Sequence, residues 1–292
     1  MKILVLGSKG QLGRCLFDQL DDTRDIVVYA SRDELDIANT NATNELITAQ
    51  NPDLVINAAA YTAVDKAESD KEVAYLINNL AVAAIAAACR DNDSLLIHIS
   101  TDYVFDGAAD QPYTETNPTS PNSVYGDSKL KGELSIQESG CNYLIIRTAW
   151  VFSQYGNNFL RTMIRLGGER DEMSVVGDQI GCPTYAQDIA KAIVLIISKL
   201  NMKDPVTEIY HYSGDQSCSW FDFAQAIFSE ANNLTFPTPK IVSSIYTAEY
   251  ATDAPRPKYS VLDCSKISAD FSVEPSNWRV GIQEALWALK SD

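Results

Sequence analysis

The feature that most constrains this chain is a strand, a glycine turn and a helix at its very start. The run from Lys2 to Leu6 is apolar after its first residue, which is typical of a buried strand. Glycines follow at every third position, Gly7, Gly10 and Gly13, and an amphipathic helix comes next. Such glycines let the backbone turn tightly and approach a pyrophosphate, whose charge then meets the helix N-terminus. The unit predicts dinucleotide binding, with an ordinary strand-to-helix turn as the alternative.

The alternation of strand and helix continues through the first half of the chain. Further strands are expected at 26–29, 53–57, 95–99 and 141–147, with helices beginning near residues 39, 69 and 123. This order is typical of a doubly wound parallel sheet.

After residue 148 the pattern is less regular. Helices are expected at 156–166, 188–200, 220–231 and 282–289, a short strand at 174–176, and a substrate-side loop at 238–257. We therefore predict an α/β fold, with a Rossmann-like doubly wound parallel sheet and a smaller C-terminal substrate domain. The cofactor domain would span residues 1–148 and the second domain residues 149–292. Part of residues 183–212 is expected to return to the first sheet.

Two groups of polar residues follow the predicted strand at 95–99. Ser100, Thr101 and Asp102 come directly after it, where open α/β sheets bind their ligands. Tyr125 and Lys129 are four positions apart, so a helix beginning near residue 123 would place both on one face, roughly 5–6 Å apart at Cβ.

That spacing has a chemical use. A phenol has an ordinary pKa of about 10, and a nearby ammonium group favours the phenolate and lowers that pKa. Tyr125 could then exchange a proton with a substrate carbonyl or alcohol, while Thr101 holds the same oxygen. Taken alone, the pair Tyr125 and Lys129 is a weak pattern, because an ordinary surface helix carries such residues too.

Two further observations bear on the cofactor. The second strand is followed by Arg32, where enzymes of this fold that prefer NAD usually carry an acidic residue. This favours NADPH, with NADH as the alternative, although Asp33 and Glu34 are close by. Asn78 lies inside an expected helix, where asparagine is not favoured. It would either bond neighbouring backbone or serve the cofactor site.

Composition excludes several classes of partner. The formal charge of −16 argues against nucleic acid and anionic membranes as partners. No apolar run reaches about 18 residues and no signal peptide is indicated, so we expect a cytoplasmic protein without a membrane span. The six cysteines are scattered and only two histidines occur, which argues against a disulfide framework or a zinc site.

At this point the motifs resemble a known family. The glycine turn, NAAA at 57–60, STDYVFDG at 100–107, YGDSK at 125–129 and RTAWVF at 147–152 are similar to the extended short-chain dehydrogenases. The longer blocks NAAAYTAVDKAE, YGDSKLKGE, GNNF and GCPTYAQDIA more narrowly resemble the dTDP-4-dehydrorhamnose reductase family. The likeness is collinear over nearly the whole chain.

The resemblance implies NADPH-dependent reduction of the 4-keto group of dTDP-4-dehydro-L-rhamnose to give dTDP-L-rhamnose. The catalytic set of that family falls on Thr101, Tyr125 and Lys129, with Tyr125 as the proton donor. The substrate would be bound by Thr101, Asp102, Tyr125 and Trp150. Cofactor contacts would fall on Gly10, Gln11, Leu12, Asp36, Ile37, Ala60, Tyr61, Thr62, Tyr125 and Lys129, to which the patterns above add Gly7, Gly13, Arg32 and Asn78.

Two other functions remain open at this stage. One is another sugar-nucleotide epimerase or dehydratase of the same superfamily, which would retain NAD through its cycle. The other is a non-catalytic subunit, because the regulatory β subunit of methionine adenosyltransferase resembles the same family. The intact set of Thr101, Tyr125 and Lys129 favours the reductase, since a pure binding subunit has no need of all three.

One departure from the family concerns metal. Some members form a metal-linked dimer through two acidic positions, which are Cys15 and Gln187 here. A hard cation such as Mg²⁺ needs oxygen ligands, and a thiol is a poor substitute. Asp18 and Asp188 are near in sequence and could supply the charge instead, but adjacent helical residues such as Gln187 and Asp188 point about 100° apart. We therefore expect no structural metal, and a monomer or a dimer formed by another surface.

Overall fold

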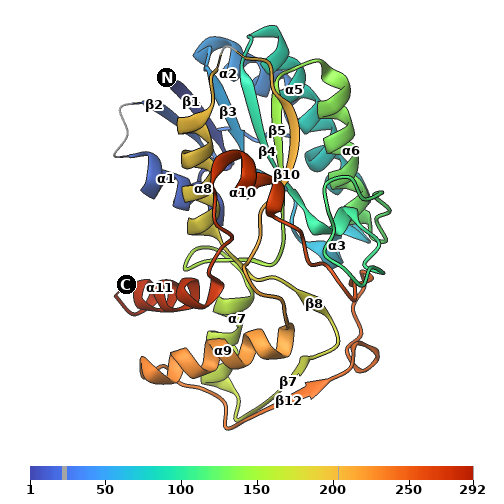
Figure 1. Cartoon of the computed structure of the whole chain (residues 1–292), viewed down its shortest axis with the longest axis vertical. Helices are drawn as coiled ribbons and strands as arrows, with labels where there is room; N and C mark the ends of the chain where they lie inside the picture. The colour runs from blue at the N-terminus through green and yellow to red at the C-terminus, as the bar shows by residue number, and fades with distance from the viewer. Residues whose placement is uncertain (22–24, 203, 292) are drawn as a thin grey trace.

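A six-stranded parallel sheet lies at the centre of the larger of two parts of the molecule (Figure 1). The computed structural model describes residues 1–21, 25–202 and 204–291. The strand order is β10-β5-β4-β3-β1-β2, and each neighbouring pair is parallel. The strands are β1 (Lys2–Leu6), β2 (Ile26–Ala30), β3 (Leu54–Asn57), β4 (Leu95–Thr101), β5 (Tyr143–Thr148) and β10 (Thr207–His211). The predicted α/β doubly wound fold is confirmed.

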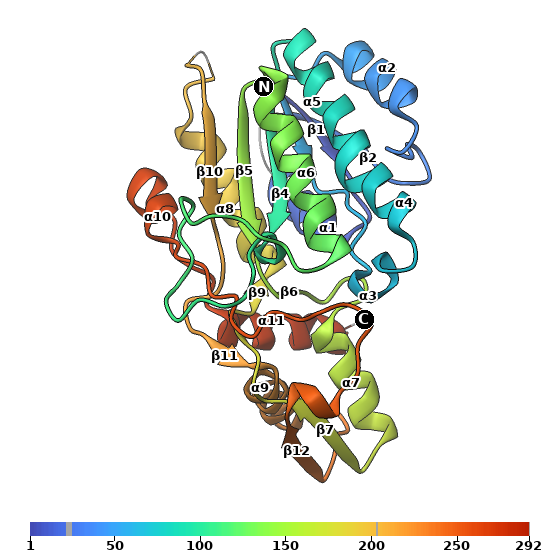
Figure 2. The ribbon, with the colours of Figure 1, turned by 90° about the vertical axis from the view of Figure 1, so that its right-hand side faces the viewer.

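Helices cover both faces of this sheet. On one face lie α1 (Gln11–Leu20) and α8 (Ala186–Lys199), and on the other lie α2 (Thr40–Gln50), α5 (Ala81–Asp91) and α6 (Val124–Ser139), which Figure 2 shows in front. Strands covered on both faces read as nearly continuous apolar runs, which is why they could be found in the sequence. The chain passes from β1 outward to β2 and then back to β3, so the strand order reverses between β1 and β3.

The expected helix near residues 69–90 has an irregular middle. It consists of α4 (Lys71–Tyr75), a π-helical turn labelled η1 (Leu76–Leu80) and α5. Asn78 lies in the π turn, a feature that is frequent at functional sites. By length and composition alone, residues 71–91 form a helix that could cross a membrane, with a mean hydropathy of 1.6, a property that the core helix of a soluble protein can share. In this structure that helix packs against α2 and α6.

The second part of the chain lies below the sheet in Figures 1 and 2. Its core is built mainly from α7 (Phe159–Glu169), α9 (Trp220–Asn233), α11 (Trp278–Ser291) and β7 (Glu172–Val176), which pairs with β12 (Ile241–Ile245). The expectation of a loop across 238–257 is therefore wrong at β12, a strand that is hard to predict because it is mostly exposed and shows little alternation of apolar and polar residues. The shorter elements are α3 (Val64–Ala67), η2 (Asp102–Val104), β6 (Val151–Phe152), β8 (Ile180–Gly181), β9 (Thr184–Tyr185), β11 (Cys218–Ser219), η3 (Thr247–Glu249) and α10 (Ser265–Phe271).

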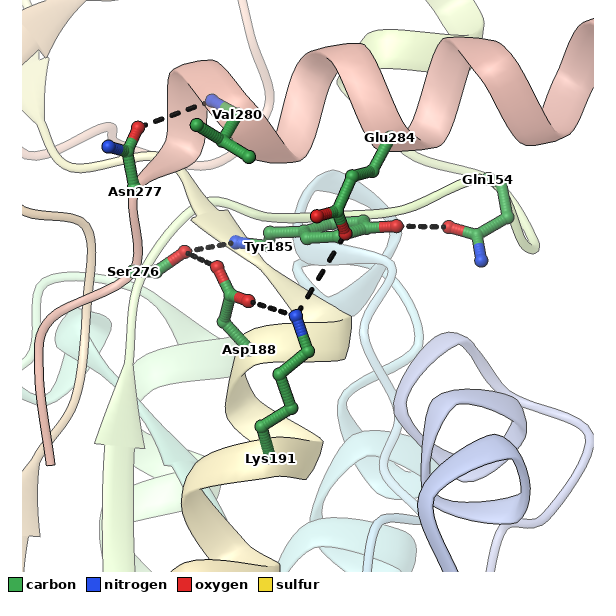
Figure 3. A network of polar contacts seen from close by, with 8 residues as sticks. All are labelled: Gln154, Tyr185, Asp188, Lys191, Ser276, Asn277, Val280 and Glu284. Carbon is green, nitrogen blue, oxygen red and sulfur yellow. Dashed lines mark hydrogen bonds and ion pairs between the residues drawn. The ribbon is translucent and has the colours of Figure 1, made fainter.

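A polar network joins α8 to the C-terminal segment (Figure 3). Ser276 Oγ accepts from the Tyr185 N–H at 3.1 Å and donates to Asp188 at 2.8 Å. Lys191 lies 3.2 Å from Asp188 and 3.9 Å from Glu284 of α11. Because α8 packs on the sheet and α11 belongs to the second core, this network holds the two parts of the chain together.

Candidate active site

A cavity of about 560 Å³ lies at the carboxyl ends of β1, β3 and β4. We call it the strand-end cavity. It borders the point where the strand order reverses, which is where open α/β sheets bind ligands. The expected site residues that line it are Gly10, Gln11, Leu12, Ala60, Thr62, Thr101, Asp102, Tyr125, Lys129 and Trp150.

The glycine turn presents the start of α1 to this cavity. Gly10 is the N-terminal cap of α1 and has extended backbone, so no cap side chain covers the first amides of the helix. Gly7 has a positive φ of 80°, and a Cβ there would lie 2.7 Å from the Ala59 nitrogen. Glycine at position 7 thus lets the loops after β1 and β3 approach each other, while uncovered amides at a helix start suit a phosphate.

Tyr125 and Thr101 meet at the floor of the cavity. Ser123 caps α6 by accepting from the Gly126 N–H at 3.1 Å, so Tyr125 falls in the first turn of the helix as expected. Burial raises the pKa of Tyr125 well above its ordinary value, and its hydrogen bond with Thr101 offsets this only in part. The Thr101 hydroxyl donates its one proton to Asp102 at 3.0 Å. Burial raises the pKa of Asp102 to about 6.

Lys129 does not act on Tyr125 in this structure. Its Nζ donates to the Ile99 carbonyl at 2.7 Å and lies 3.2 Å from His98 Nε2, so the amine is turned toward β4. Burial lowers the pKa of Lys129 to about 8, against the opposing charge of Glu133. The expectation that Lys129 lowers the pKa of Tyr125 is therefore wrong for this arrangement, although both residues share one helix face and one cavity.

Two hydroxyl groups in the cavity wall have no protein partner among the described residues. They are Ser100 Oγ and Thr148 Oγ1, at the ends of β4 and β5. Buried hydroxyls are normally hydrogen-bonded. Both hydroxyls are therefore left without a partner within the described protein. Ser100 belongs to the polar group that the sequence places just after the strand at 95–99, whereas Thr148 was not singled out from the sequence.

Asn78 supports the cavity from outside. Its amide accepts from the Tyr61 N–H at 2.9 Å, donates to the Tyr61 carbonyl at 3.0 Å and donates to Ser128 Oγ at 3.0 Å. Of the two roles considered for Asn78, the bond to neighbouring backbone is the one observed. It ties the loop that carries Tyr61 and Thr62 to α6, two elements that both border the cavity.

The other expected cofactor residues lie away from the cavity wall. Arg32 is exposed in the turn after β2, Asp36 is exposed, and Ile37 is buried in the core. Lys9, which the sequence reading did not single out, pairs with Asp33 at 2.6 Å in the same region. The positively charged side chains of Lys9 and Arg32 therefore both lie near the outer end of the glycine turn. Gly13 packs its α-carbon against the backbone of Gly7 and Ser8.

Trp150 and Trp220 form an aromatic wall on the opposite side of the cavity. Their rings stack with centroids 3.5 Å apart and planes within 7°. Trp150 has a positive φ of 47°, and Gly181 packs directly against its indole. The sequence pointed to Trp150 but not to Trp220, which comes from the start of α9, and only tertiary packing brings the two together.

A second cavity, of about 620 Å³, adjoins the first. Asp65, Trp220 and Arg256 border it, and Trp220 and Arg256 also border the strand-end cavity. Arg256 donates to Asp65 at 2.5 Å and to the Tyr103 hydroxyl at 2.9 Å. We call this second space the adjoining cavity. Arg256 was missed in the sequence because nothing local distinguishes it from a solvated surface arginine.

Cys15 of α1 and Gln187 of α8 stand where some family members have acidic metal ligands. Cys15 is fully buried, and burial raises the pKa of its thiol to about 12, with smaller contributions from Asp18 and Asp188. Gln187 Oε1 is buried without a hydrogen-bond partner among the described residues. In the part of the chain that the structure describes, no three His, Cys, Asp or Glu side chains group as metal ligands.

Known proteins share this sequence and architecture. Residues 1–291 match the family described as RmlD substrate binding domain. The dTDP-4-dehydrorhamnose reductase of Aggregatibacter actinomycetemcomitans is 43% identical over 281 residues, which cover 95% of this chain and 96% of that protein. The crystal structure of a dTDP-4-dehydrorhamnose reductase from Clostridium acetobutylicum has a TM-score of 0.92 and 38% identity, covering 99% of this chain and 100% of the other.

A third similar protein was crystallised with a cofactor. The dTDP-4-dehydrorhamnose reductase of Bacillus anthracis, solved in complex with NADP, has a TM-score of 0.90 and 37% identity, covering 98% of this chain and 99% of the other. That complex supports NADPH as the cofactor of this chain. The chain therefore belongs to the dTDP-4-dehydrorhamnose reductase family and is an NAD(P)H-dependent oxidoreductase.

Proposed function

We propose that this protein reduces the 4-keto group of dTDP-4-dehydro-L-rhamnose to give dTDP-L-rhamnose, with NADPH as the preferred reductant and Tyr125 as the proton donor. The observation that carries the proposal is the strand-end cavity, in which Thr101, Tyr125 and Lys129 lie beside the start of α1. The names of the similar reductases support the choice of substrate.

The cofactor would be held along the carboxyl edge of the sheet. The amides of Gln11 and Leu12 would bind the pyrophosphate, and Ala60 and Thr62 would border the remainder. Arg32 would attract the 2′-phosphate from outside the cavity, with Lys9 in support. When bound, the reduced nicotinamide supplies the hydride, and the protein contributes position and a proton.

Tyr125 would supply that proton. Its raised pKa means that the phenol is protonated at neutral pH, as a proton donor must be. Its hydroxyl would donate to the C4 oxygen as negative charge develops there. The Thr101 hydroxyl, which donates to Asp102 in this structure, would steady the resulting phenolate by turning its one proton toward Tyr125. Lys129 is placed to reach a cofactor ribose, because it lines the same cavity on a flexible stem.

The substrate would occupy both cavities. We place the sugar against Thr101, Asp102 and Trp150 in the strand-end cavity. The nucleotide would then extend into the adjoining cavity, where Phe159, Met163 and Val175 offer apolar surface. Arg256 borders both spaces, at the position that a connecting diphosphate would cross. The proposal includes a cofactor domain over residues 1–148 and a sugar-nucleotide domain over residues 149–292, with part of residues 183–212 returning to the first sheet.

The test is a coupled assay. The dTDP-4-keto-6-deoxy sugar is supplied with its upstream epimerase, and loss of reduced-nicotinamide absorbance is followed with NADPH and with NADH. Stoichiometric oxidation of NADPH with formation of dTDP-L-rhamnose supports the proposal. Tightly retained NAD that turns over without net oxidation would instead support an epimerase or dehydratase. Binding of sugar nucleotide without turnover would favour a non-catalytic role like that of the regulatory β subunit of methionine adenosyltransferase.

A further inference from the structure

His98 is a buried titratable residue to which the mechanism above gives no role. It lies in β4, two positions after Leu96, and its side chain is fully buried. Asn57 of β3 contacts its Nδ1 at 3.1 Å, and Lys129 of α6 contacts its Nε2 at 3.2 Å. His98 therefore connects Asn57, the last residue of β3, with Lys129, which lines the strand-end cavity.

The hydrogen bonds determine where the single proton of this imidazole lies. Asn57 Oδ1 accepts from the Ala59 N–H at 3.1 Å, so the amide nitrogen of Asn57 is the atom that faces His98. An amide nitrogen only donates, which leaves Nδ1 of His98 as the acceptor. Burial holds the pKa of His98 well below its ordinary value, so the ring is neutral. Its proton therefore lies on Nε2 and points at Lys129.

A donor on His98 restricts the charge that Lys129 can carry in this position. An ammonium group has only donors, whereas a neutral amine has one lone pair. The Nε2–H of His98 and the ammonium would oppose each other, but a neutral amine can accept from Nε2–H and still donate to the Ile99 carbonyl at 2.7 Å. The observed contacts are thus satisfied by the uncharged form of Lys129.

We propose that His98 is a positioning residue which, oriented by Asn57, holds Lys129 as a neutral amine against β4 and so couples its move toward the cofactor to the uptake of one proton. This inference rests on the proposed role of Lys129 at the cofactor ribose. In the position against β4 the amine is mostly uncharged once the pH exceeds about 8. In the cavity, beside ribose oxygens, it is an ammonium.

The other charged and titratable groups around Lys129 do not remove this effect. Glu133, one turn further along α6, favours the ammonium, but its carboxylate is held by the guanidinium of Arg147 in β5 at 2.7 Å. Tyr125 of α6 and Asp102 and Tyr103 of η2 border the same cavity from the other side. The pKa of Lys129 against β4 is accordingly lowered to about 8, mainly by burial.

The measurable consequence is a pH dependence of cofactor affinity. If Lys129 has a pKa of about 8 against β4 and stays protonated in the complex, the Kd for NADPH rises about 30-fold from pH 7 to pH 9.5. Calorimetric titrations at pH 9 in two buffers of different ionisation enthalpy should show uptake of about one proton per NADPH bound. Circular dichroism at each pH verifies that the protein stays folded.

His98→Gln is the decisive variant. The glutamine oxygen can turn toward Lys129 and accept from an ammonium, which would raise the pKa of the lysine above about 8, while burial still holds it below its ordinary value of about 10.4. The Kd for NADPH should then rise clearly less over the same pH range than the rise of about 30-fold expected for the wild type. Lys129→Met is the matched control, with weaker binding and a flat profile. An equal rise in Kd for wild type and His98→Gln, or a rise that persists in Lys129→Met, would overturn the proposal.

A second variant tests the same idea through the tautomer. In Asn57→Asp a carboxylate would accept from Nδ1–H, so Nε2 would present a lone pair to Lys129 and favour the ammonium. Its profile should flatten as in His98→Gln, and a wild-type profile in a folded Asn57→Asp protein would contradict the proposal. These titrations need only the cofactor, so they can succeed even if the sugar assay fails.

Discussion

Asp102 should make the stability of this protein depend on pH in a way that one substitution removes. The carboxyl is 3% exposed, and burial raises its pKa to about 6, although hydrogen bonds with Ser260 and Thr101 oppose that shift. A folded-state pKa above the unfolded value of about 3.9 means that ionisation disfavours the folded protein. The cost is absent below the unfolded pKa, grows as the pH rises between the two values, and is constant above the folded pKa.

The size of this effect follows from the shift. Two pKa units correspond to about 3 kcal/mol of lost folding free energy at pH 8, and about half of that is already lost at pH 5. Asp102→Asn keeps an oxygen that can accept from Thr101 but cannot ionise. The free energy of unfolding of the variant, minus that of the wild type, should therefore be larger at pH 8 than at pH 5 by roughly 1–2 kcal/mol.

Urea unfolding followed by tryptophan fluorescence at pH 5, 6, 7 and 8 measures this difference. Contributions that do not depend on pH, such as a changed hydrogen bond, cancel when the two proteins are compared across the series. Asp110→Asn, at a position outside the buried site, is the control and should show no comparable trend. A difference between Asp102→Asn and wild type that stays constant from pH 5 to pH 8 would refute the reasoning.

Four further outcomes are expected. Tyr125→Phe should lower kcat by about 10²–10⁴-fold with NADPH affinity near normal, and a kcat within a few-fold of wild type would mean that another group is the acid. Arg32→Ala should lower the ratio of kcat/KM with NADPH to that with NADH, and an unchanged ratio would remove Arg32 from cofactor selection. Arg147→Met should reduce the free energy of unfolding by about 3–5 kcal/mol, because it leaves the Glu133 carboxylate buried without its partner, and adding Glu133→Gln should recover part of the loss in urea titrations. Light scattering should give the same mass with and without EDTA, since Cys15 is a poor ligand for Mg²⁺, whereas a mass that falls with EDTA and returns with Mg²⁺ would contradict the expectation of no structural metal.

The sequence by itself determined the elements whose signal is local. The apolar run and glycine turn at Lys2 to Gly13 predicted β1 and the start of α1, because a buried parallel strand is apolar throughout and the turn needs glycine. The i, i+4 spacing of Tyr125 and Lys129 predicted a shared helix face, and α6 does present both to one cavity. The sequence also shows directly that Cys15 stands where some family members have an acidic residue. The absence of a structural metal and the division into domains at residue 148 stay predictions.

Only the tertiary structure decided which distant residues meet. Trp220 stacks on Trp150 from 70 positions further along the chain, and Arg256 reaches Asp65 across 191 positions. The direction of Lys129 was likewise set by His98 and the Ile99 carbonyl on a neighbouring strand, rather than by Tyr125 on its own helix. Local periodicity records which face of an element is buried, but it carries no information on the partner. Only the packed structure decides which hydrogen-bond donor or acceptor each buried polar group meets. That contact in turn decides which charge a buried side chain can keep.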